Sequence, residues 1–66
     1  MKHYLYEEEI SGEEFIVGAN NIEEADEYAE EVCKSIADNW NDGEYKMMYI
    51  CRLTDEEAEA SGLDEY

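Results

Sequence analysis

Three residues carry side chains that often perform chemistry in proteins: His3, Cys33 and Cys51. His3 is the single imidazole among the 66 residues, and no serine or cysteine stands near it in a nucleophile setting. The two cysteines lack the spacing and the second histidine that a zinc site needs. The four glycines are scattered, so they form no phosphate-binding loop. We therefore expect no catalytic residue, no metal site, no cofactor and no enzymatic activity.

The segment from Asp38 to Tyr49 contains fragments of a calcium-binding loop. Asp38, Asp42 and Gly43 occupy the first, fifth and sixth positions of an EF-hand loop. Trp40 stands where the third ligand belongs, and Tyr49 stands where a bidentate glutamate is required. These two misses argue against an EF-hand. Neighbouring glutamates carry little information about an acid–base pair, because a chain this acidic contains many such neighbours.

The acidic residues are more informative as a group. Twenty Asp and Glu stand against four Lys and Arg, which gives a net charge of −16 at pH 7. Such a surface repels phosphates, which argues against direct binding to nucleic acid or to an anionic membrane. The sequence also lacks a run of ~20 apolar residues that could span a membrane. The partner that this charge predicts is a basic protein.

The composition favours one folded domain over a disordered polyanion. Hydrophobic residues make up 44% of the chain and aromatic residues 12%, which is enough for a small core. Cys33 and Cys51 lie in apolar patterns with no secretory signal before them. We therefore expect free thiols and a cytoplasmic location.

Residues 2–10 and 13–19 are rich in aromatic and β-branched side chains and flank the turn dipeptide Ser11-Gly12, a pattern that predicts a β-hairpin. A two-residue turn pairs Ile10 with Glu13 and sets Glu9 opposite Glu14. The core face of this hairpin is expected to carry Tyr4, Tyr6, Ile10, Phe15, Val17 and Ala19. The outer face is expected to carry His3, Leu5, Glu7, Glu9, Glu14 and Ile16.

A helix is predicted over residues 22–39, because Asn21 suits the N-cap and Glu24 can complete a capping box. Residues 39–43 (NWNDG) suit its C-terminal end. The apolar stripe expected to face the core is Ile22, Ala25, Ala29, Val32, Cys33, Ile36 and Trp40. The opposite side of the helix is acidic and carries only one lysine, Lys34.

Residues 44–53 predict a third strand with apolar residues on both faces, and residues 55–61 predict a short helix that Thr54 and Glu57 cap and Gly62 ends. The sequence therefore predicts an α+β fold, a single ββαβ(α) domain. Its antiparallel sheet has the order 2-1-3, with the main helix on one face. The uncovered side of the third strand is left to the C-terminal segment, to a second copy in a homodimer, or to a partner.

The candidate partner-binding residues are acids that this arrangement places on the surface. Six of them recur about every 4 Å over about 22 Å of the main helix, a spacing similar to the 3.4 Å between phosphates of one DNA strand. Carboxylates accept the same charge-assisted hydrogen bonds from Arg and Lys as phosphates do. The full set is Glu7, Glu9, Glu14, Glu23, Glu24, Glu27, Glu30, Glu31, Asp38, Asp55, Glu56, Glu57 and Glu59.

In size, charge and lack of catalytic residues, the chain resembles the small acidic DNA-mimic inhibitors of phages and mobile elements, which include anti-CRISPR and anti-restriction proteins. The acidic stretches behind this resemblance are EEE at 7–9, EEADEYAEE at 23–31 and DEEAE at 55–59. The resemblance implies an inhibitor of host defence that occupies the nucleic-acid groove of a nuclease, most plausibly a CRISPR effector. For a phage protein it also implies the host bacterial cytoplasm. DNA mimics share no common fold, so no residue roles follow from it.

Two other functions remain open. An acidic protein-interaction module, such as an adaptor or an antitoxin, needs the same surface without mimicry. A structural domain from a halophile would also be acidic and poor in lysine. Because Glu outnumbers Asp in this chain, the halophilic alternative is the less favoured of the two.

Overall fold

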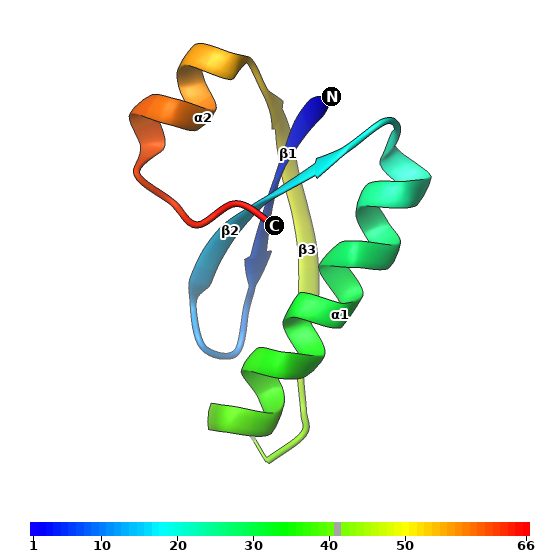
Figure 1. Ribbon diagram of the computed structural model, residues 1–66. Helices are drawn as coiled ribbons and strands as arrows, with labels where there is room; N and C mark the ends of the chain where they lie inside the picture. Colours follow the sequence, from blue (N-terminus) through cyan, green and yellow to red (C-terminus); the bar gives the residue numbers. More distant parts are fainter. Residues whose placement is uncertain (41) are drawn as a thin grey trace.

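The computed structural model describes residues 1–40 and 42–66, which fold into a three-stranded sheet with two helices (Figure 1). The elements are β1 (Lys2–Glu8), β2 (Glu13–Ala19), α1 (Ile22–Trp40), β3 (Met47–Leu53) and α2 (Asp55–Ser61). The sheet order is β2-β1-β3, and both neighbouring pairs are antiparallel. The predicted α+β class, element order and sheet order are therefore confirmed.

The hairpin register differs from the prediction by two residues. Tyr4 pairs with Val17 and Tyr6 with Phe15, so β1 ends at Glu8 and the turn spans residues 9–12. A shift of two keeps every side chain on its predicted face, and Tyr4, Tyr6, Phe15, Val17 and Ala19 are all buried. Ile10 is the exception. It lies in the turn and is exposed, so its place in the core was wrong.

Glu8 is the physical cause of the longer turn. Its carboxylate accepts the backbone N–H groups of Ile10 at 3.1 Å and Ser11 at 2.8 Å, while its carbonyl accepts the N–H of Gly12 at 2.8 Å. Gly12 has φ +78°, the left-handed conformation that glycine adopts at little cost. These bonds curl the chain immediately after Glu8 and end the strand there.

The same carboxylate delays the start of β3. Glu8 also accepts the N–H of Lys46 at 2.8 Å, and the carbonyl of Lys46 accepts the N–H of Glu9 at 2.8 Å. The chain before Met47 is thus held by the Glu8 side chain, and β3 begins at Met47 instead of at the predicted residue 44.

The core lies between α1 and the sheet. α1 buries Ala25, Ala29 and Cys33 against Tyr4, Tyr6, Phe15 and Val17, and Ala37 is also buried. Small side chains let the helix approach the aromatic layer closely. Tyr6 stacks on Phe15 with ring centroids 5.8 Å apart, and its hydroxyl donates to Asp26 at 2.5 Å.

The ends of α1 extend past the sheet. Nineteen helical residues span about 28 Å, whereas seven strand residues span about 23 Å. Trp40, in the last turn, is therefore 76% exposed, and Ile22 in the first turn is also exposed. The prediction that both belong to the buried stripe was wrong. Gly43 donates its N–H to the carbonyl of Ala37 at 3.0 Å and so helps to end the helix; Asn41, within the predicted helix end, lies outside the described residues.

A bulge in β3 accounts for its apolar residues on both alternating sets. Leu5 pairs with Cys51, but Tyr6 pairs with Tyr49, so Ile50 is an extra residue. The bulge changes the phase of the strand. Met47 and Tyr49 lie on the α1 side, whereas Cys51 and Leu53 lie on the opposite side. The first half of β3 therefore places these apolar side chains on the α1 side of the sheet, and the second half places them on the opposite side.

The far side of the sheet is covered by the C-terminal part of the chain. Ile16 was expected on an outer face, but it is fully buried. Its N–H donates to the carbonyl of Asp64 at 2.9 Å, and its carbonyl accepts the N–H of Tyr66 at 2.8 Å, so residues 64–66 extend the sheet beyond β2. The sequence left the C-terminal segment as one of three covers for the third strand. α2 contacts β3, but Met48 and Ile50 stay exposed, so this part of the chain covers that strand only partly.

α2 follows the prediction at both ends. Thr54 and Glu57 form a reciprocal capping box, with 3.1 Å for each of the two bonds. Gly62 closes the helix in the left-handed conformation, with φ +70°. α2 contacts β1 and β3, and only Ala58 among its residues is buried.

Candidate protein-interaction surface

The outer side of α1 carries the longest row of acids in the molecule. Helical geometry places Glu23, Glu27, Glu31 and Asp38 opposite the buried alanines, and all four are exposed. With Glu24 and Glu30 they span about 22 Å along the helix axis. We refer to these six residues, Glu23, Glu24, Glu27, Glu30, Glu31 and Asp38, as the α1 acidic row.

Two members of the α1 acidic row also have structural contacts. Glu30 accepts the hydroxyl of Tyr45 at 3.1 Å and pairs with Lys34 at 3.7 Å. Burial of Tyr45 and this bond raise the pKa of Tyr45 above its usual value. Glu24 is half-buried, and its N–H donates to the Oδ1 of Asn21 at 2.9 Å, which confirms Asn21 as the N-cap. In residues 1–40 and 42–66, Glu30 is the one member of the row with an ion pair.

A second group of acids lies on the other side of the sheet. Glu7 pairs with Glu14 across the hairpin, and both alternate with Tyr6 and Phe15, which face α1. The expected like-charge pair therefore exists, but it involves Glu7 in place of Glu9. Glu9 lies in the turn and forms an ion pair with Lys46 at 3.3 Å.

The acids of α2 belong to this second side and differ in their contacts. Asp55 is bonded to His3 at 2.6 Å, and the side chain of Glu57 completes the capping box. Glu56 and Glu59 are exposed. The structure thus divides the 13 candidate residues between two sides of the sheet, with Glu9 at the hairpin end.

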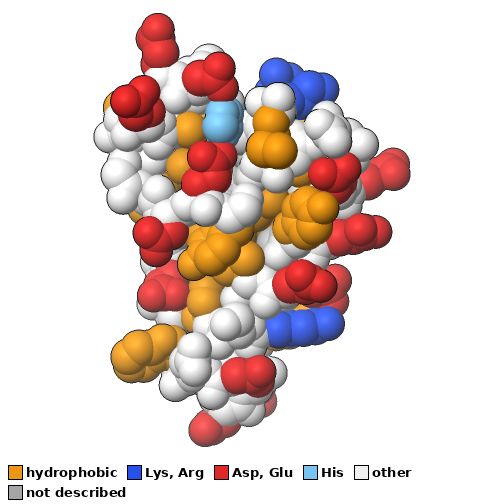
Figure 2. Space-filling view, viewed as in Figure 1, with side chains coloured by type: hydrophobic (Ala, Val, Ile, Leu, Met, Phe, Trp, Pro, Cys, Tyr) orange, Lys and Arg blue, Asp and Glu red, His pale blue; other side chains and the backbone are white. Residues whose placement is uncertain are grey.

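Figure 2 shows that acidic side chains lie around the rim of the visible face, over α1, α2 and the hairpin, with hydrophobic side chains between them. Lysine and arginine appear in only two places on this face. The negative charge is therefore spread over the surface of a folded domain. The net charge of −16 lies outside a core of buried hydrophobic residues.

Two aromatic residues of α1 were not among the candidate site residues. Trp40 is 76% exposed and Tyr28 is 45% exposed, so each presents a ring on the same helix as the α1 acidic row. Trp and Tyr often supply much of the binding energy of protein interfaces. The overhang of the helix exposes Trp40, and the sequence contains no signal of that overhang.

No protein-family model, curated protein or solved structure shows a significant match to this chain. Among residues 1–40 and 42–66, no three His, Cys, Asp or Glu side chains are grouped so that they could hold a metal ion. No helix within the described part of the chain is long and apolar enough to cross a membrane.

The three side chains that could perform chemistry, Cys33, Cys51 and His3, are held within the fold. Cys33 is a free thiol in the core, and its burial raises its pKa to about 11, with a further contribution from the charges of Glu8 and Glu30. A thiol with so high a pKa is a poor nucleophile. Cys51 is a free, half-buried thiol on the opposite side of the sheet.

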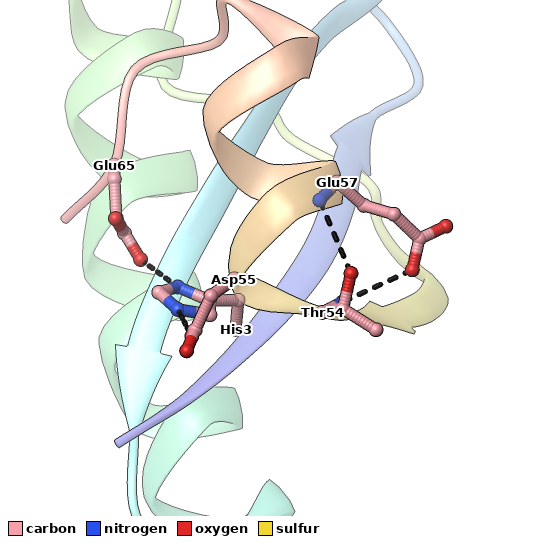
Figure 3. Close-up of polar contacts among 5 residues, drawn as sticks. All are labelled: His3, Thr54, Asp55, Glu57 and Glu65. Carbon is pink, nitrogen blue, oxygen red and sulfur yellow. Dashed lines mark hydrogen bonds and ion pairs between the residues drawn. The ribbon is translucent and has the colours of Figure 1, made fainter.

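His3 joins three parts of the chain (Figure 3). Its Nε2 contacts Asp55 of α2 at 2.6 Å, and its Nδ1 contacts Glu65 of the C-terminal segment. The carboxylate of Glu65 passes over Gly18, where an added Cβ would lie 3.4 Å from its Oε2. The hydrogen bonds from Glu65 and then Asp55 raise the pKa of His3 above 6.5.

Replacing His3 with glutamine is expected to remove a pH-dependent part of the stability. Because the pKa of His3 is raised by folding, its contribution is fully present below about pH 6.5 and is lost as the pH rises through the folded-state pKa. We expect His3→Gln to cost about 1–2 kcal/mol near pH 6 and much less near pH 9. Urea unfolding of both proteins across this range measures the difference.

Taking the difference between His3→Gln and the wild type cancels the general effect of pH on a highly acidic chain. A constant difference from pH 6 to pH 9 would show that His3 does not act through its charge.

Proposed function

We propose that this protein inhibits a nucleic-acid-binding protein by placing the α1 acidic row in the basic groove that normally holds DNA or RNA. The observation that supports this most directly is the exposure of the row on one rigid helix, opposite its buried face. α1 contains seven acidic residues against Lys34 alone. The natural counterpart of such a row is a surface lined with Lys and Arg.

The mechanism is inhibition by occupancy. Carboxylates every ~4 Å along α1 would accept hydrogen bonds from side chains that otherwise contact phosphates. Tyr28 would add apolar contact area beside the row. Trp40 lies on the core-facing side of α1 where the helix extends past the sheet, so it would add apolar contact area only at the C-terminal end of the helix. No chemical step is involved, so the inhibitor leaves its target intact and acts only while it is bound.

A nuclease is the target class that we propose, and a CRISPR effector is the first target to test. The direct experiment is competition for a labelled nucleic acid bound to a catalytically inactive effector, followed by fluorescence anisotropy. We expect the inhibitor to release the nucleic acid. We also expect its own affinity for the effector to fall about tenfold or more between about 0.1 and 0.5 M NaCl, because salt screens the charge pairs. A ternary complex at full occupancy of both ligands would rule out direct competition.

Trp40 gives an independent readout, because it is the single tryptophan of the chain. Protein labelled with 5-fluorotryptophan has one ¹⁹F resonance, which is expected to broaden and shift when the basic target binds α1. The same titration with an acidic protein of similar size serves as the control. An unchanged resonance with a bound target would place the contact away from the C-terminal end of α1.

The halophilic alternative makes a different prediction. A halophilic domain needs near-molar salt to fold, because cations must offset the repulsion among its acids. We expect this chain to keep its fold at about 0.05 M NaCl, because its core is built from apolar contacts and its buried Glu8 is held by backbone N–H groups. Far-ultraviolet circular dichroism and thermal unfolding at low salt measure this. Loss of the fold at low salt would favour the halophilic domain.

A further inference from the structure

β3 differs in charge from every other element of the fold. It is the one helix or strand of the described chain without an acidic residue, and it carries Arg52. Its exposed residues are largely apolar: Met48 is 38% exposed, Tyr49 45% and Ile50 39%. Met48 lies on the face away from α1 and Tyr49 on the α1 face, so exposed apolar side chains lie on both faces of this strand within an otherwise acidic molecule.

β3 is also the open edge of the sheet. Among residues 1–40 and 42–66 it pairs with β1 alone, whereas the other edge, formed by β2, is extended by residues 64–66. An edge strand presents backbone N–H and C=O groups that a further strand can pair with. Proteins often protect such edges with proline or with several charges. The sequence has no proline, and Arg52 is the one charged residue in β3.

We propose that β3 pairs antiparallel with β3 of a second copy of this chain, which forms a two-fold symmetric dimer with a continuous six-stranded sheet. The charge distribution favours a second copy at this edge. Two molecules of net charge −16 repel each other least where neither presents acids, and β3 is that place. β3 itself carries Arg52 and no carboxylate, so along this strand a basic segment would find no acidic side chain to pair with.

The ends of β3 favour the antiparallel direction. Lys46 precedes the strand, whereas Asp55, Glu56 and Glu57 follow it closely. An antiparallel pair places Lys46 of each copy near the acidic start of α2 in the other copy. A parallel pair would instead align lysine with lysine and acids with acids. Isologous pairing of this kind is the commonest closed symmetry among homodimers.

The two net charges make the predicted dimer weak and sensitive to salt. Stable interfaces bury about 1,200–2,000 Å², and one short strand with three apolar side chains contributes less, so we expect a dissociation constant on the order of 10–100 μM. Salt reduces the repulsion between the two copies and should strengthen the dimer. This trend is opposite to that expected for binding of the α1 acidic row to a basic target, so the two proposals can fail separately.

The test is sedimentation velocity at protein concentrations from about 10 μM to 1 mM, in about 0.05 and 0.5 M NaCl. We expect a monomer–dimer equilibrium whose dissociation constant falls about tenfold in the higher salt. A monomer under all of these conditions overturns the proposal, as does a dimer that salt weakens.

Ile50→Lys and Ile10→Lys provide a matched pair of variants. Both replace an exposed isoleucine and change the net charge by the same amount, but Ile10 lies in the hairpin turn, at 52% exposure, and not on the β3 edge. We expect Ile50→Lys to abolish dimerisation, although its reduced negative charge alone would favour it. Ile10→Lys should dimerise at least as well as the wild type. Equal dimerisation by the two variants contradicts the proposed edge.

Hydrogen exchange of the unmodified protein supplies a test that does not depend on how a variant folds. Amides in residues 47–53 should gain protection as the protein concentration rises, while amides in β2 should not. Protection that does not change with concentration in residues 47–53, under conditions where a dimer sediments, would place the interface elsewhere.

Discussion

Replacing Glu27, Glu31 and Asp38 with lysine is expected to weaken binding to the basic target by about 100-fold, or ~3 kcal/mol. Each replacement turns an attraction to the groove into a repulsion. The three residues were chosen because they are exposed members of the α1 acidic row that form no ion pair within residues 1–40 and 42–66. Glu30 is left in place, since it holds the hydroxyl of Tyr45 and pairs with Lys34. The fold should be unaffected or slightly stabilised, because self-repulsion decreases.

The matched control is the triple variant Glu14→Lys, Glu56→Lys and Glu59→Lys. These residues are also exposed and give the same net charge, but they lie on the other side of the sheet. We expect the control to bind within about fivefold of the wild type, because it alters only the long-range field. Isothermal titration calorimetry at one salt concentration compares the three proteins. An equal loss for both variants would mean that binding follows net charge and not the α1 surface.

Local signals in the sequence predicted several boundaries of the fold correctly. β2 and α2 have the predicted limits, since Gly12, Thr54 and Gly62 mark their ends through backbone conformation and capping bonds. These interactions involve residues within three positions of each other, so a sequence pattern can report them. The α+β class followed from these turn and capping residues together with the helical and strand periodicities of the apolar residues.

Features that depend on distant contacts were not predictable in this way. The turn after β1 is set by Glu8, which also binds Lys46 far along the chain. The burial of Ile16 depends on residues 64–66, a segment too short to show a strand pattern of its own. The bulge at Ile50 is visible only once β3 is paired with β1. Each of these features is a long-range pairing whose register the local sequence leaves open.

The sequence predicted which face of each element carries the candidate acids, but not the contacts that individual acids make. The helical period placed the α1 acidic row correctly opposite the core, because one repeat governs both sides of a helix. The period of two along the hairpin likewise placed Glu7 and Glu14 on the face away from the core, where the structure has them. The sequence contains no sign that Asp55 is bonded to His3. The exposed acids along one side of α1 are the reason that we propose this helix as the contact.

Glu8 was the acid of the EEE stretch left out of the candidate binding residues, and it is fully buried. Burial alone would raise the pKa of Glu8, but the N–H groups of Lys46, Ser11 and Ile10 outweigh it and lower the pKa to about 2. The carboxylate thus stays charged inside the protein because backbone donors replace water around it. It joins the end of β1, the turn and the start of β3.

Replacing Glu8 with glutamine is expected to lower the free energy of unfolding by about 3 kcal/mol at pH 7. The amide group of glutamine turns one acceptor into a donor, which leaves at least one buried N–H without a partner and removes the charge from the remaining bonds. A domain of this size has a total stability on the order of 3–10 kcal/mol, so the loss is a large share of it. Urea unfolding at pH 7 gives the measurement, and Glu13→Gln, the same change at an exposed site opposite Glu8, is expected to cost less than about 0.5 kcal/mol.

The pH dependence separates the charge of Glu8 from its shape. Because its pKa is lowered from 4.5 to about 2 by folding, its stabilising effect is present above about pH 4.5 and is lost as the pH falls toward 2. The difference between the wild type and Glu8→Gln should therefore shrink in acid, since both side chains are then neutral. A difference that stays constant down to pH 2.5 would mean that packing, and not the buried charge, makes Glu8 important. In that case the hydrogen bonds that the charged Glu8 carboxylate accepts would not be what stabilises the turn of residues 9–12.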